Sequence, residues 1–154
     1  MDNKKADLIY FVLVIWFIVA LPLGISAYDR YSWNLRIPQE AKVFDLTGNT
    51  QKGWVSGHIE AADVLIGSLI PRQFSPPVIT VNKGDRVILR LASSDVVHGF
   101  SLKDFDIFVN DGIHPGKPQI VSFIADKAGT FTFACNSICG SLHENMSGTI
   151  LVNA

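Results

Sequence analysis

The sequence has little sulfur and almost no net charge. Its 154 residues include two cysteines and two methionines, and the formal net charge is −1. This near-neutral balance gives no general electrostatic attraction to nucleic acid. The sequence contains no internal repeat, no low-complexity tract and no glycine-rich phosphate-binding loop. It also offers no nucleophile–base pair, so any enzymatic activity would belong to a complex that contains the chain.

One long segment lacks charge altogether. Residues 8–27 are twenty uncharged, mostly apolar residues, and about twenty such residues span a bilayer as a helix. A secretory signal peptide cleaved after Ile25-Ser26-Ala27 is the alternative, but its apolar core is typically only about 7–15 residues. We therefore predict a retained single-pass transmembrane anchor over residues 1–30 in the cell (or inner) membrane. We expect the rest of the chain on its outer, periplasmic side.

The remainder of the sequence has the pattern of a β domain. Residues 31–44 show no clean period and are interpreted as a linker, and residues 45–154 as one domain. Short runs with a period of two, separated by Gly, Pro, Asn and Asp, are typical of an all-β sandwich or Greek-key barrel. The clearest predicted strands are 78–81, 86–92, 95–102, 106–110, 119–125, 129–135 and 148–152. Residues 45–70 are strand-like but less regular.

All the sulfur beyond Met1 lies in one short segment. The run CNSICGSLHENM contains Cys135, Cys139, His143 and Met146 with the spacing C-x3-C-x3-H-x2-M. Thiolate, thioether and imidazole together suit a soft, redox-active metal, and copper is the first candidate. His98, on an earlier predicted strand, would join this loop if the two strands pair.

The number of candidate ligands favours two metal ions over one. A mononuclear blue-copper site uses one cysteine, whereas the two thiolates here could both bridge a pair of ions. Each ion then needs one imidazole, which His98 and His143 can supply. Each also needs one weak ligand, which the Met146 thioether and the backbone carbonyl of Ser137 can supply. A dinuclear copper site uses every candidate.

Two structural alternatives remain open at this point. The two cysteines of an exported domain often form a disulfide, although a C-x3-C bridge within one turn would be strained. The two cysteines with His98 and His143 also have the ligand types of a tetrahedral zinc site, which leaves Met146 without a role. His58 and His114 each stand alone in polar surroundings and are expected to be solvated loop residues.

The same segments resemble the dinuclear copper (CuA) domain of cytochrome c oxidase subunit II. The resemblance covers about residues 74–154. It rests on DVVHGF at 95–100, the Pro-Gly turn at 115–116, AGTFTFAC at 128–135, the sulfur-rich loop at 135–146 and SGTILV at 147–152. A single N-terminal helix resembles the single-helix branch of that family.

The resemblance implies a cupredoxin-like Greek-key barrel and a role in electron transfer. One copper would be completed by His98 and Met146, the other by His143 and the Ser137 carbonyl, with both cysteines bridging. Electrons would come from a cytochrome c or a small copper protein and pass to haem in oxidase subunit I, where dioxygen is reduced and protons are pumped. Many family members have Glu at the position of Ser137, where it helps to hold an interface magnesium ion, so only the backbone role is expected here.

Other functional classes are compatible with the same motif. Nitrous oxide reductase uses this copper module beside a large catalytic domain, and we do not expect such a domain within these 154 residues. A membrane-tethered copper carrier without an oxidase partner is the main alternative function.

Overall fold

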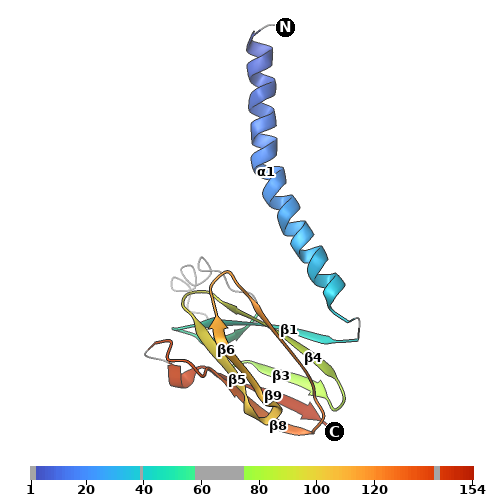
Figure 1. Ribbon diagram of the computed structural model, residues 1–154, viewed down its shortest axis with the longest axis vertical. Helices are drawn as coiled ribbons and strands as arrows, with labels where there is room; N and C mark the ends of the chain where they lie inside the picture. The colour runs from blue at the N-terminus through green and yellow to red at the C-terminus, as the bar shows by residue number, and fades with distance from the viewer. Residues whose placement is uncertain (1–2, 39, 58–74, 141–142) are drawn as a thin grey trace. The chain divides into compact units, whose positions relative to one another are not determined.

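The chain forms two compact units, Met1–Gln39 and Glu40–Ala154. The computed structural model describes residues 3–38, 40–57, 75–140 and 143–154. Within these ranges the first unit is one helix and the second is built of two β-sheets (Figure 1).

The helix α1 (Asn3–Arg36) is continuous through Pro22. Its segment Lys4–Tyr28 is long and apolar enough to cross a membrane, and none of it is buried inside the structure. Large apolar side chains are exposed around it, for example Trp16 at 64% and Phe17 at 59%. A helix satisfies its own backbone hydrogen bonds, so an apolar surface of this kind suits a lipid environment. These features fit a single-pass membrane protein.

The predicted linker, 31–44, is shorter in the structure than the sequence suggested. The helix reaches Arg36, and the first strand, β1 (Lys42–Asn49), begins inside the predicted linker. Residues 31–36 show no amphipathic period in the sequence, which is the signal that marks a helix packed on one face. The polar end of α1 therefore could not be distinguished from a linker by its pattern.

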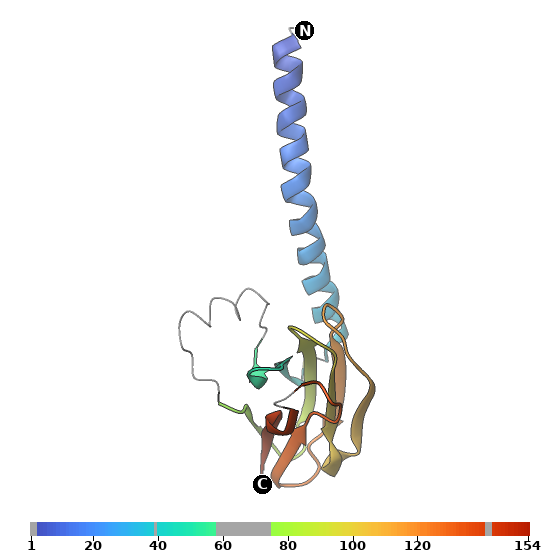
Figure 2. The same ribbon diagram turned by 90° about the vertical axis from the view of Figure 1, so that its left-hand side faces the viewer.

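The second unit has a four-stranded sheet, in the order β2-β1-β4-β7, and a five-stranded sheet, in the order β3-β9-β8-β5-β6 (Figures 1 and 2). Most neighbours are antiparallel, but β1 pairs in parallel with β4, and β3 with β9. The remaining elements are β2 (Gly53–Ser56), β3 (Val78–Asn82), β4 (Arg86–Ser93), β5 (His98–Leu102), the 3-10 helix η1 (Lys103–Phe105), β6 (Ile107–Ile113), β7 (Gln119–Ile124), β8 (Gly129–Ala134), the 3-10 helix η2 (His143–Asn145) and β9 (Ser147–Asn153).

The predicted fold class, an all-β domain preceded by one helix, is confirmed. Each of the seven clearest predicted strands overlaps a strand of the structure. The less regular region 45–70 contains most of β1 and all of β2, and its residues from 58 onward lie outside the described ranges. The strand β1 lies inside its sheet, between β2 and its parallel partner β4. Its sequence therefore lacks the simple alternation of apolar and polar residues that marks a strand with one exposed face.

The core lies between the sheets and extends to the start of β5. Val87, Leu89 and Leu91, which alternate along β4, are all fully buried. Three aromatic rings pack together beside them, with ring centroids 5.6 Å apart for Trp54 and Phe100 and 5.4 Å apart for Phe100 and Phe133. Trp54 also lies beside the imidazole of a buried histidine, the first residue of β5. The packed core therefore supports this end of β5 directly.

Candidate metal centre

The strand pairing brings the predicted site residues to one end of the β unit. Ala134 at the end of β8 pairs with Ser147 at the start of β9, so both ends of the connecting loop meet. A hydrogen bond of 2.9 Å from the Cys135 N–H to the Met146 carbonyl closes this loop. Ser101 of β5 pairs with Ala134, which places β5 beside the same loop. The loop and β5 together supply all six predicted ligands.

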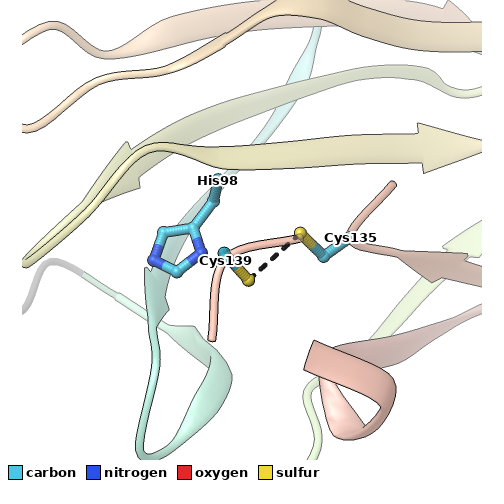
Figure 3. A group of neighbouring side chains, drawn as sticks. All are labelled: His98, Cys135 and Cys139. Carbon is cyan, nitrogen blue, oxygen red and sulfur yellow. Dashed lines mark hydrogen bonds between the residues drawn. The ribbon is translucent and has the colours of Figure 1, made fainter. Parts of the chain in front are cut away.

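Three of these residues form a compact group. One ring nitrogen of His98 and the sulfurs of Cys135 and Cys139 all lie within 4.8 Å of one another (Figure 3). The two sulfurs are 3.6 Å apart, and both cysteines are free, so the structure contains no disulfide between them. The arrangement presents two thiols and an imidazole to a common point, as a soft metal ion requires.

The other three predicted residues contact this group. Cys139 Sγ lies 3.7 Å from Nδ1 of His143 and 3.2 Å from Sδ of Met146. Cys135 Sγ lies 3.2 Å from the carbonyl oxygen of Ser137. Met146 is 1% exposed, and its thioether faces Cys139. A zinc site of two cysteines and two histidines would not use the Met146 sulfur, which lies beside Cys139 here.

His98 is held by one ring nitrogen and leaves the other free for a ligand. Its side chain is fully buried, and Nε2 lies 2.7 Å from Oδ1 of Asp95. The other nitrogen, Nδ1, is buried and has no hydrogen-bond partner among the described residues. A buried polar atom without a partner is costly, and a metal ion would satisfy it. The residues therefore fit a copper centre.

The carboxylate of Asp95 is itself held in place. Both the backbone N–H and the hydroxyl of Thr50 donate to Asp95 Oδ2, at 2.7 and 2.6 Å. Burial by itself would raise the pKa of Asp95, but the hydrogen bonds from Thr50, His98 and Val96 outweigh it and hold the pKa below its usual value. The carboxylate is therefore charged at neutral pH and can only accept hydrogen bonds.

The two thiols titrate very differently in the metal-free protein. Burial would raise the pKa of Cys135, but the neighbouring imidazole of His98 and hydrogen bonds with the backbone of Ser137 and Gly99 lower it to about 6. Burial and the neighbouring Cys135 raise the pKa of Cys139 to about 11. At neutral pH the negative charge therefore lies mainly on Cys135, and the adjacent Cys139 keeps its proton. A thiolate is the form of cysteine that binds metal.

His98 has a raised pKa, although burial alone would lower it, because the Cys135 sulfur and the Asp95 carboxylate favour its protonated form. Metal ligation requires the neutral imidazole, so binding releases any proton held at Nδ1.

Several residues around the site were not assigned a role from the sequence. Asp95 lies three residues before His98, a spacing that could have drawn attention to it. Thr50 and Gly48 come from β1 and the turn after it, and no local signal connects them to a ligand 45 or more positions away. Of the two histidines predicted to be solvated, His114 is exposed. The other, His58, lies outside the described residues.

Comparison with known proteins places this site in a family. Residues 55–154 match the family model described as cytochrome c oxidase subunit II, periplasmic domain. Cytochrome c oxidase subunit 2 of Thermus thermophilus is 34% identical over 79 residues, which cover 51% of this chain and 57% of that protein. The nitrous-oxide reductase of Cupriavidus necator is 31% identical over 137 residues, which cover 86% of this chain and 19% of the reductase. The chain thus spans about half the length of the oxidase subunits it matches.

Solved structures show the same fold at low sequence identity. The periplasmic domain of subunit II of cytochrome oxidase (CoxB) of Bradyrhizobium japonicum aligns with a TM-score of 0.56 and 23% identity, over 75% of this chain and 86% of that one. A chain of a heme-copper terminal oxidase dimer aligns with a TM-score of 0.53 and 19% identity, over 99% of this chain and 100% of that one. Both support the predicted cupredoxin-like fold. Because the family model matches well over half of the sequence, the chain belongs to the copper-binding family of cytochrome c oxidase subunit II.

Proposed function

We propose that this chain is the electron-accepting subunit of a haem-copper terminal oxidase and that it holds a dinuclear copper centre. The observation that carries the proposal is the convergence of His98, Cys135 and Cys139 within 4.8 Å, together with the buried Nδ1 of His98, which has no hydrogen-bond partner in the part of the chain that the structure describes. Family membership supports a role within an oxidoreductase complex. The chemistry of the site supports one-electron transfer rather than substrate turnover.

Each ligand has a specific task in this proposal. The thiolates of Cys135 and Cys139 would bridge both ions, which is supported by their 3.6 Å separation. One ion would be completed by His98 and Met146, and the other by His143 and the carbonyl of Ser137. When bound, such a copper pair supplies one-electron acceptance and donation.

The surrounding chain keeps these ligands in place when the charge of the centre changes. His98 begins a buried strand, and the Cys135–Met146 backbone hydrogen bond ties the two ends of the loop together. The His98 ring lies beside the buried Trp54, and Cys135 and Met146 belong to the apolar core, which excludes water from this side of the site. Ligands that move little add little reorganisation energy, and water-excluded surroundings tune the potential of a metal site.

The remaining assignments concern the membrane and the partners. The helix α1 would anchor the chain in lipid, with the β unit on the periplasmic side. The electron donor would be a cytochrome c or a small copper protein, and the acceptor the haem of oxidase subunit I. Dioxygen reduction and proton translocation would take place in the complex, because the active site lies in the partner subunit.

Metal analysis of the full chain in detergent, combined with electron paramagnetic resonance, tests the proposal. We expect two copper ions per chain, one unpaired electron shared over both, and co-purification with a haem-bearing membrane protein. A single ion per chain, zinc in place of copper, or a Cys135–Cys139 disulfide in the working state would overturn it. Exchangeable copper in a chain that never associates with haem protein would instead support a copper carrier.

A further inference from the structure

We propose that Thr50 is a positioning residue of the metal centre, which acts through Asp95 to set the orientation and the tautomer of His98. This inference rests on the proposed copper function for its consequence, but its geometry involves protein atoms alone. It assigns a role to β1 and the turn that follows it, a region without any candidate ligand.

The three residues form a continuous chain of hydrogen bonds. Thr50 donates twice to Oδ2 of Asp95, from its backbone N–H at 2.7 Å and from its hydroxyl at 2.6 Å. The second carboxylate oxygen, Oδ1, accepts from the Val96 N–H at 2.8 Å and lies 2.7 Å from Nε2 of His98. All four hydrogen bonds converge on one carboxylate, which leaves it little freedom to rotate.

The direction of these hydrogen bonds determines which nitrogen carries the proton. Both oxygens of Asp95 already accept hydrogen bonds from Thr50 and Val96, so the carboxyl group acts as an acceptor and Nε2 of His98 donates to it. The neutral imidazole then has its lone pair on Nδ1, the buried atom for which the described residues offer no partner. In Figure 3 the ring lies beside Cys139 and Cys135. A hydrogen bond from the non-ligating nitrogen to a carboxylate is the usual way to hold a ligand histidine in the correct tautomer and orientation.

The same region restricts the ring from a second direction. A Cβ atom added to Gly48, in β1, would lie 2.8 Å from Cδ2 and 3.0 Å from Cγ of His98. The backbone of β1 therefore packs directly against the imidazole. Thr50 follows two residues later, so one short segment both contacts the ring and holds its hydrogen-bond acceptor.

Thr50 also lies against the loop that carries the other ligands. The position of a Cβ on Gly140, the residue after Cys139, is 3.4 Å from Cγ2 of Thr50. The hydroxyl of Thr50 thus faces Asp95, and its methyl group faces the ligand loop. A substitution that keeps the size of the side chain but removes the hydroxyl separates these two roles.

The experiment compares Thr50→Val, Asp95→Ala and the double variant with the unchanged full chain in detergent. Thr80→Val, at an exposed position of β3, is the matched control. Nitrogen-15 NMR of the metal-free, histidine-labelled chains, recorded at a pH above the titration of His98, reports its tautomer, and copper(I) competition with a chelator reports affinity.

We expect the unchanged chain and Thr80→Val to show the Nε2–H tautomer. Asp95→Ala should give a mixture of tautomers and about 10–100-fold weaker copper binding, the usual range for the loss of an outer-shell partner. Thr50→Val should change the tautomer and the copper affinity in the same direction but by a smaller amount. We expect the affinity to fall by about tenfold or less, because the backbone N–H of residue 50 still donates to Asp95. If Thr50 acts through Asp95, Thr50→Val should have no further effect in the Asp95→Ala background.

Three results would overturn the inference. One is an unchanged tautomer and affinity in both single variants. Another is a loss of thermal stability alone, which a merely structural turn would produce. The third is an additive effect of the two substitutions on affinity. A chain that binds no copper would refute the proposed function. The tautomer is measured without metal, so it would still decide the role of Thr50.

Discussion

The two halves of the candidate metal centre are held in different ways. The strand half consists of His98 and Cys135, which lie at the start of β5 and just beyond the end of β8. Both are buried; His98 Nε2 is held by Asp95, and Cys135 Sγ accepts a hydrogen bond from the N–H of Gly99, 36 residues earlier. The loop half consists of Cys139, His143 and Met146. Cys139 contacts both His143 and Met146, and Ile138 beside Cys139 is 95% exposed, whereas Met146 itself is buried in the core.

The ligands of the two halves are therefore positioned by different structural features. The strand half is positioned by sheet pairing and by a buried core, which exist whether or not metal is bound. The loop half is positioned by its internal spacing and by the closed ends of the loop. We expect the strand half to be formed before metal arrives and the loop half to gain most of its rigidity from the metal.

The largest effect should follow from removing either sulfur that joins the two halves. Cys135→Ser, in the strand half, and Cys139→Ser, in the loop half, should each abolish the electron paramagnetic resonance signal shared over two coppers, because neither half alone can bridge two ions. Retention of that signal in either variant would contradict the dinuclear assignment.

A substitution against the strand half should reduce stability even without metal. The Cβ of Gly48→Ala would lie within 3 Å of the His98 ring, and overpacking of this kind typically costs about 1–3 kcal/mol. Urea unfolding of the metal-free chain measures this loss. Gly24→Ala, where an added Cβ meets no atom within 4 Å, is the control and should leave the unfolding of the β unit unchanged. Equal midpoints for the two variants would show that the strand half is not rigid before metal binds.

A change in the loop half should be milder. Met146→Leu conserves volume at a buried position, so the unfolding free energy should fall by less than about 1.5 kcal/mol. A thioether is a weak ligand that mainly tunes potential, so both coppers should remain while the reduction potential changes. Voltammetry of the copper-loaded chain checks this, and loss of one copper per chain would show that Met146 is a principal ligand.

The smallest effect should come from a polar pair in the four-stranded sheet, outside both halves. Arg90 Nε and Asp45 Oδ1 are 2.6 Å apart, with side chains 35% and 39% exposed. Asp45→Asn should cost no more than about 1 kcal/mol, because exposed ion pairs contribute little. Copper content and the resonance signal should not change. A shift in either would mean that this sheet is coupled to the metal centre through β1.

The loop half could be predicted almost completely from the sequence, whereas the strand half could be predicted only in part. The spacing of Cys139, His143 and Met146 is local, and a short loop with both ends joined brings such residues together. His98 could be nominated as a ligand because its strand was recognisable. Its supports could not, because Gly48 and Thr50 reach it through the parallel pairing of β1 with β4. That pairing joins segments far apart in sequence and leaves no periodic signal.

The sequence by itself determined the apolar helix, the β character of residues 78–153 and the set of candidate soft ligands on one loop. Each of these follows from local composition, period or spacing. Only the tertiary structure decided that β1 lies at the centre of a sheet and that Asp95 lies against Nε2 of His98, which leaves Nδ1 without a hydrogen-bond partner among the described residues. The physical reason is that burial, strand pairing and hydrogen-bond direction depend on neighbours in space, which become neighbours only when the chain has folded.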